Sequence, residues 1–112
     1  MASPTMIRIT AVSLFLLLSA IPAWAKTPQI AIVLRGHQFV PVDVTAPAGT
    51  RIELRVHNAQ KVPAEFESSS LHREQVVTPG ATIRVYVGPL SPGRYEFFDD
   101  FHPATRGHLV VK

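Results

Sequence analysis

The sequence contains no cysteine, and this absence removes several kinds of chemistry at once. A cysteine nucleophile, a thiolate metal site and an iron–sulfur cluster all require a thiol. Small secreted domains often use disulfides to supplement a thin hydrophobic core. This chain must therefore be held together by packing, or gain stability from a bound ligand.

Three further patterns are also missing. The chain has no glycine-rich phosphate loop and no Gly-x-Ser-x-Gly nucleophile motif. Nucleic-acid-binding domains normally cluster their basic residues. Here the formal net charge is only +3, and the arginines of the predicted domain are spread along the chain, at Arg35, Arg51, Arg55, Arg73, Arg84, Arg94 and Arg106. We interpret them as solvated surface and expect no nucleic-acid partner.

One long apolar run is present, at residues 9–20. Arg8 precedes it, and the small-x-small sequence Ala23-Trp24-Ala25 follows, just before Lys26. This layout is typical of a cleaved secretory signal peptide, and the run is shorter than the ~20 apolar residues of a membrane-spanning helix. We predict that residues 1–25 are removed on export and that residues 26–112 form one domain without a membrane span.

The rest of the chain consists of short apolar runs. Residues 51–57 and 81–87 alternate between apolar and polar side chains, which is typical of strands with one face on the core. Residues 38–44 form a run broken by Pro41, which suits an edge strand or a bulge. Further strands are expected at residues 29–34, 94–98 and 108–111.

Proline and glycine separate these runs. Pro79-Gly80 and Pro92-Gly93 predict type II turns, because proline presets φ at the first central position and glycine supplies a positive φ at the second. No stretch keeps helical spacing for three turns. About seven short strands with frequent turns predict an all-β sandwich.

Two segments break the alternation and concentrate ionisable groups. The first, residues 63–74, contains Glu65, Glu67, His72 and Glu74. The second, residues 97–103, contains Asp99, Asp100 and His102. Charged side chains beside phenylalanines are costly to desolvate unless they are paired or bind a metal. Carboxylates with imidazole suit iron, manganese, Cu(II) or zinc.

A structural interpretation of the same residues stays open. Asp99 and Asp100 can cap the backbone or pair with Arg94 or Arg106, which would leave His102 at a loop surface. Glu67 and Glu74 can be solvated or paired with Arg73. His37, His57 and His108 read as ordinary polar residues.

Residues 93–102 (GRYEFFDDFH), followed by residues 107–111 (GHLVV), resemble the ligand loop of cupredoxins. In that family the pattern is Gly-x-Tyr-x-Phe-x-Cys-x-x-His, then a methionine and a Gly-x-hydrophobic strand. Asp99 stands at the cysteine position, His102 at the histidine position, and Thr105 or Arg106 where methionine is expected. Upstream, Ala64 replaces the first copper histidine. The resemblance implies a cupredoxin-like Greek-key β-sandwich that has no blue-copper centre.

Residues 62–68, 71–74 and 88–102 resemble one branch in particular. It comprises the cupredoxin-like proteins that accompany bacterial oxidase-dependent iron permeases, related to the N-terminal domain of the periplasmic iron-uptake protein EfeO. The resemblance implies a periplasmic metal-binding accessory protein of an iron-uptake system, with an iron or copper ion as cofactor. Its implied partners are an inner-membrane iron permease and a second periplasmic metal-binding protein.

The resemblance also implies a set of ligands. Glu65, Asp99 and His102 are carried over as metal ligands, with Asp100 next to them. The remaining candidates, which would form a second site or support the first, are Glu67, His72 and Glu74. Because carboxylate replaces thiolate, we expect a preference for harder ions, with Cu(II) as the nearest competitor of iron. Three hypotheses remain: a binding accessory protein, a small ferroxidase, and a metal-free module that docks on the permease.

Overall fold

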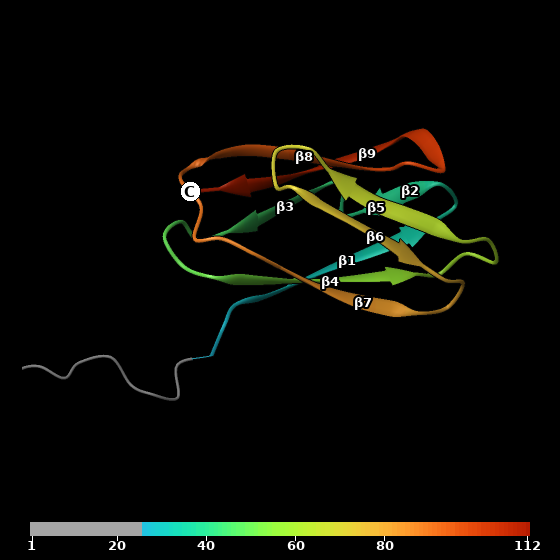
Figure 1. Cartoon of the computed structure of the whole chain (residues 1–112), viewed down its shortest axis with the longest axis horizontal. Helices are drawn as coiled ribbons and strands as arrows, with labels where there is room; N and C mark the ends of the chain where they lie inside the picture. The colour runs from blue at the N-terminus through green and yellow to red at the C-terminus, as the bar shows by residue number, and fades with distance from the viewer. Residues whose placement is uncertain (1–25) are drawn as a thin grey trace, which may run out of the picture.

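The computed structural model describes residues 26–112, so the predicted signal peptide, residues 1–25, lies outside the described residues (Figure 1). The described part contains strands and turns but no helix, and therefore no helix long and apolar enough to cross a membrane. The all-β prediction is confirmed.

Nine strands form two sheets that pack face to face as layers (Figure 1). One sheet has four strands in the order β2-β1-β4-β7, and the other has five in the order β3-β9-β8-β5-β6. The strands are β1 (Gln29–Arg35), β2 (Gln38–Val40), β3 (Asp43–Ala46), β4 (Ile52–Asn58), β5 (Ala64–Ser68), β6 (Arg73–Val77), β7 (Thr82–Val87), β8 (Gly93–Asp99) and β9 (His102–Val111).

The break at Pro41 is larger than the sequence indicated. Residues 38–44 were expected to form one interrupted strand, but β2 and β3 belong to different sheets. Each is an edge strand, β2 beside β1 and β3 parallel to β9. Because proline has no N–H to donate to a ladder, the chain leaves the first sheet at Pro41 and joins the second after it.

The hydrophobic core lies between the sheets and follows the predicted alternation. Ile52, Leu54 and Val56 of β4 are buried, as are Val85 and Val87 of β7.

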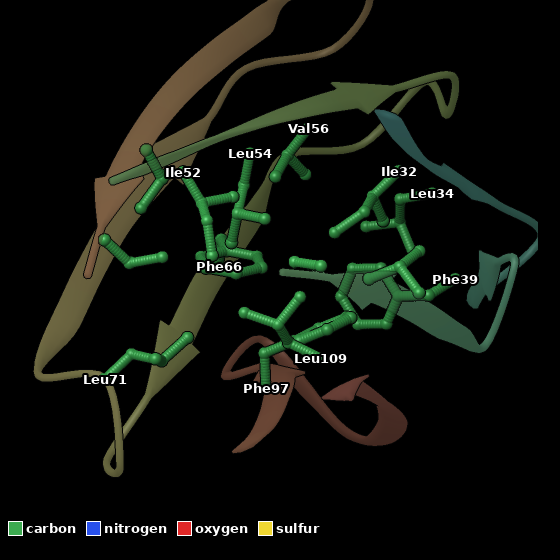
Figure 2. Packing of buried hydrophobic residues seen from close by; sticks show 14 of the residues in the cluster. Ile32, Leu34, Phe39, Ile52, Leu54, Val56, Phe66, Leu71, Phe97 and Leu109 are labelled. Atoms are coloured by element: carbon green, nitrogen blue, oxygen red, sulfur yellow. The ribbon is translucent and has the colours of Figure 1, made fainter. Parts of the chain in front are cut away.

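Three phenylalanines, Phe39, Phe66 and Phe97, lie at the centre of this core (Figure 2). Phe39 meets Phe97 edge to face, with ring centroids 4.9 Å apart, and Phe66 lies 5.2 Å from Phe97. Aromatic pairs at such distances each contribute about 0.5–1.5 kcal/mol beyond their area burial.

Two sequence interpretations were wrong. Residues 63–74 do not break the alternation; they form most of the β5–β6 hairpin, in which Ala64, Phe66 and Ser68 face the core. Pro92-Gly93 is not a type II turn, because Gly93 does not have a positive φ. The turn at Gly80 is confirmed: its φ is 76°, and the Ala81 N–H donates to the Thr78 carbonyl at 3.0 Å.

Candidate metal centre

Three carboxylates meet on the outer face of the five-stranded sheet. Glu65 and Glu67 lie on β5 and point outward because Phe66 between them points into the core. Asp100 follows β8, and its backbone N–H donates to the Glu65 carbonyl at 2.9 Å. One ligand oxygen from each carboxylate lies within 4.8 Å of the other two. We call these three residues the carboxylate cluster.

A fourth carboxylate adjoins the cluster. Glu74 on β6 is directly opposite Glu67 in the β5–β6 register, and like charges in such a pair repel. Within residues 26–112, none of these four acids forms an ion pair. The neighbouring Arg73 does not compensate, since its guanidinium donates to the Tyr86 carbonyl at 2.9 Å and 3.0 Å. The alternative that Glu67 or Glu74 pairs with Arg73 is therefore wrong.

Desolvation and, after it, repulsion change the protonation of the cluster. Desolvation, followed by the charge of Glu74 and the proximity of Asp100, raises the pKa of Glu65 to about 7. The pKa of Glu67 is also raised, first by desolvation and then by the charges of Asp100 and Glu74. A bound cation would remove this penalty by balancing the negative charge.

Asp99 has a different environment. It is 2% exposed at the end of β8, and its Oδ1 accepts the backbone N–H groups of Glu65 at 2.9 Å and Phe101 at 3.0 Å. The carboxylate thereby holds the start of β5 against the β8–β9 turn. The alternative that Asp99 or Asp100 pairs with Arg94 or Arg106 is wrong.

Those two arginines have other partners. The guanidinium Nη1 of Arg94 lies 3.7 Å from Oδ2 of Asp43, and Nη1 of Arg106 lies 2.7 Å from Oε1 of Glu96.

His102 lies apart from the carboxylate cluster. Its ring stacks on that of His37, with centroids 4.1 Å apart and an interplanar angle of 15°. The hydroxyl of Thr105 donates to the His37 carbonyl at 2.7 Å and lies 2.9 Å from His102 Nδ1. Because the hydroxyl proton is already used, Thr105 Oγ1 accepts a proton from Nδ1, which leaves Nε2 of His102 as the acceptor in the neutral ring.

Sequence reasoning missed this pairing because His37 and His102 are distant in the chain and the contact depends on how the strands are arranged. His37 has a φ of 59°, which is uncommon for a residue other than glycine, and its N–H donates to Gln60 Oε1 at 2.8 Å. This positive φ marks His37 as unusual, but it is a property of the structure and could not be read from the sequence.

His72 is placed at a third location, in the turn between β5 and β6. It has a φ of 56° and lines an open pocket of about 480 Å³ together with Glu67, Ser68, Ser69, Arg73 and Glu74. In the part of the chain that the structure describes, the carboxylate cluster is the one group of three side chains close enough to share a metal ion. The structure thus brings Glu65, Glu67 and Asp100 together and places His72 and His102 outside that group.

A blue-copper centre does not fit these residues. No thiol is present, and Asp99, which stands at the cysteine position, already accepts two backbone N–H groups. Ala64, at the first histidine position, is 1% exposed and belongs to the core. Thr105 is buried and hydrogen bonded to the turn that carries His37. The donor set that remains is dominated by oxygen, which suits hard cations.

Known proteins share both the sequence family and the fold. A family model described as cupredoxin-like domain matches residues 8–111. An uncharacterized protein of Rickettsia prowazekii is 44% identical over 84 residues, which cover 74% of this chain and 67% of that protein.

Solved structures extend the comparison. The metal-binding domain of the Cu(I)-exporting P-type ATPase CopA of Streptococcus pneumoniae, solved with Cu(I), has a TM-score of 0.68 at 17% identity, covering 75% of this chain and 84% of that one. Auracyanin A, a blue copper protein of Chloroflexus aurantiacus, has a TM-score of 0.65 at 16% identity, covering 78% and 100%. These identities show a common fold and nothing further. The predicted cupredoxin-like sandwich is confirmed, and the chain belongs to the cupredoxin-like domain family.

Proposed function

We propose that this protein is a periplasmic metal-binding accessory protein of a bacterial iron-uptake system and that it binds iron at the carboxylate cluster. The observation that carries the proposal is the approach of Glu65, Glu67 and Asp100 oxygens to within 4.8 Å of one another, without an ion-pair partner in the described residues. Three acids held this close repel each other, and a cation between them relieves that repulsion.

The choice of metal follows from the donors. Carboxylate oxygens favour hard ions, and Fe(III) gains more from anionic ligands than Fe(II) does. Glu74 lies opposite Glu67 and can supply a further oxygen or a negative charge beside the ion. In this proposal the protein takes up iron from the periplasm and passes it to an inner-membrane permease, together with a second periplasmic metal-binding protein.

Copper is the competing metal, and its expected position is different. His102 offers Nε2, while its Nδ1 is fixed by Thr105, which is how proteins usually orient a histidine that binds a metal. A Cu(II) ion would therefore use nitrogen at His102, whereas iron would use oxygen at the carboxylate cluster.

A metal-free docking module is the second candidate. The observation that favours it is the bonding of Asp99, whose carboxylate ties β5 to the β8–β9 turn through backbone N–H groups without any ion. In this case the acids would contribute to stability or to contacts with the permease, and no stoichiometric metal would bind.

Anaerobic calorimetric titration with Fe(II) tests the proposal. The wild-type protein is expected to bind one iron, and Glu65→Gln/Asp100→Asn to lose it while remaining folded. The matched control is Asp43→Asn/Glu96→Gln, which removes two carboxylates of the same sheet that lie outside the cluster. Absence of binding by the folded wild type would leave the docking module as the function.

A separate measurement distinguishes a carrier from a ferroxidase. A ferroxidase passes electrons from Fe(II) to oxygen, four Fe(II) and four protons per O₂ reduced to water. Steady oxygen consumption with excess Fe(II), lost in Glu65→Gln/Asp100→Asn, would identify an enzyme. Oxidation of one bound iron without turnover would identify a carrier.

A further inference from the structure

Arginines that are scattered in the sequence gather on one face of the fold. In the four-stranded sheet, Arg55 of β4 lies directly opposite Arg84 of β7. Arg35 ends β1 and shares their orientation, because Ile32 and Leu34 alternate with the outward positions and are buried. The interpretation of these arginines as dispersed surface charge is therefore wrong for this face.

A single buried acid organises the centre of this face. Glu53 is 5% exposed, and its Oε2 contacts Nε of Arg55 and lies 3.8 Å from Nε of Arg84. The hydrogen bond and charge of Arg55 keep the pKa of Glu53 below its ordinary value, so it stays charged. Both arginines meet Glu53 through Nε, and their terminal amino groups remain available to a further oxyanion.

The face continues to Arg51, the residue just before β4. The guanidinium of Arg51 lies 4.3 Å from the ring centroid of Tyr86, which is the cross-strand partner of Glu53. Arg35 lies near the other end, one position beyond the Leu34–Asn58 pair, so the positive charges extend over about 26 Å at a rise of ~3.3 Å per residue. We call Arg35, Arg51, Arg55 and Arg84 the arginine face.

Apart from Glu53, the acidic residues lie on the other side of the molecule. Of the eight acids in the chain, Glu53 alone belongs to the four-stranded sheet. The others lie on the five-stranded sheet or in the β8–β9 turn, at Asp43, Glu65, Glu67, Glu74, Glu96, Asp99 and Asp100. The domain therefore has a basic face and an acidic face on opposite sides of one sandwich.

We propose that the arginine face docks on the headgroups of anionic phospholipids. Charges spread over three neighbouring strands, rather than converging on one point, match a surface that presents many phosphates. A guanidinium group can donate two hydrogen bonds to one phosphate. Tyr86, beside Arg51, is a residue type that is enriched at membrane interfaces. The acidic face is repelled by the same surface, so the domain adsorbs in one orientation, with the carboxylate cluster directed away from the lipid.

Flotation with vesicles tests this docking. The purified protein is mixed with vesicles of phosphatidylglycerol and phosphatidylcholine in equal parts, or of phosphatidylcholine alone. Wild type is expected to float with the anionic vesicles only, and less at high salt. Arg35→Gln/Arg51→Gln/Arg84→Gln should reduce partitioning roughly a hundredfold, since each basic side chain near an anionic surface contributes roughly fivefold. Arg55 is kept in this variant so that Glu53 retains its partner.

The matched control removes three positive charges from elsewhere: Arg94→Gln/Arg106→Gln/Lys112→Gln. It has the same net charge as the arginine-face variant and should keep most of the binding, with thermal unfolding by circular dichroism showing that both variants fold. Equal loss in the two variants would overturn the proposal, because net charge alone would then explain binding. Absence of wild-type flotation would also overturn it, as would tighter binding to poly-glutamate than to vesicles, which would indicate an acidic protein partner instead.

Discussion

Substitution of Asp99 tests whether its carboxylate supports the fold or binds a metal. In the structure its Oδ1 accepts the N–H groups of Glu65 and Phe101, and the side chain is almost completely buried. Asp99→Ala removes the acceptor and leaves both N–H groups without it. Asp99→Asn retains an oxygen of similar shape at the same position, without the negative charge.

The two substitutions should differ clearly in stability. A buried donor left without a partner costs about 1–3 kcal/mol, so two donors cost about 2–6 kcal/mol in Asp99→Ala. A neutral acceptor retains roughly half the strength of a charged one, and Asp99→Asn should cost about 1–2 kcal/mol. Because a domain of this size has a free energy of unfolding of about 5–15 kcal/mol, the alanine variant is close to the limit of folding.

Urea unfolding followed by far-ultraviolet circular dichroism measures both values without a metal. The free energy of unfolding is expected to be lowest for Asp99→Ala, intermediate for Asp99→Asn and highest for the wild type. A cost under about 1 kcal/mol for Asp99→Ala would refute the structural role, because the two N–H groups would then find other acceptors. An equal loss of unfolding free energy in the two variants would show that the asparagine oxygen does not replace the carboxylate as an acceptor.

Other expectations follow from the core and the acids. Gly107→Ala should destabilise the fold by about 1–3 kcal/mol or more, because its Cβ would lie 2.6 Å from a ring carbon of Phe97, whereas Gly93→Ala, with its nearest neighbour at 3.7 Å, should be nearly neutral in urea unfolding. Phe97→Ala should cost about 3–5 kcal/mol by the same measurement. The raised pKa of Glu65 means that its protonated form favours the native state; this stabilisation is complete below pH 4.5 and is lost as the pH rises through about 7. Iron displaces that proton, so iron affinity should increase between pH 5 and 7, and Glu74→Gln should lower the pKa of Glu65 in an NMR titration.

The strands that the sequence predicted well are those with local alternation. β4 and β7 place apolar residues at every second position, and one face of each lies on the core. The same alternation is present in β5, but its outward residues are glutamates, so the segment has the charge of a polar loop although Ala64 and Phe66 are buried. The division at Pro41 was visible, but the change of sheet was not, because the partners of β2 and β3 lie far away in the sequence.

The resemblance implied Glu65, Asp99 and His102 as ligands, with Asp100 beside them and Glu67 as a lesser candidate. The structure brings Glu65 and Asp100 together with Glu67, which points outward through the alternation of β5, whereas His102 is stacked on His37. His37 beside His102 and the arginine face both arise from register between distant strands, which no local pattern encodes. Side-chain chemistry was therefore readable from the sequence, whereas its assembly into groups required the fold.

The most direct test of the central claim is a crystal structure of the iron-loaded protein with anomalous diffraction recorded at the iron edge. The account predicts a single anomalous peak among the oxygens of Glu65, Glu67 and Asp100 on the outer face of the five-stranded sheet. A peak at His102 instead, or no peak in crystals soaked with iron above its calorimetric dissociation constant, would contradict it.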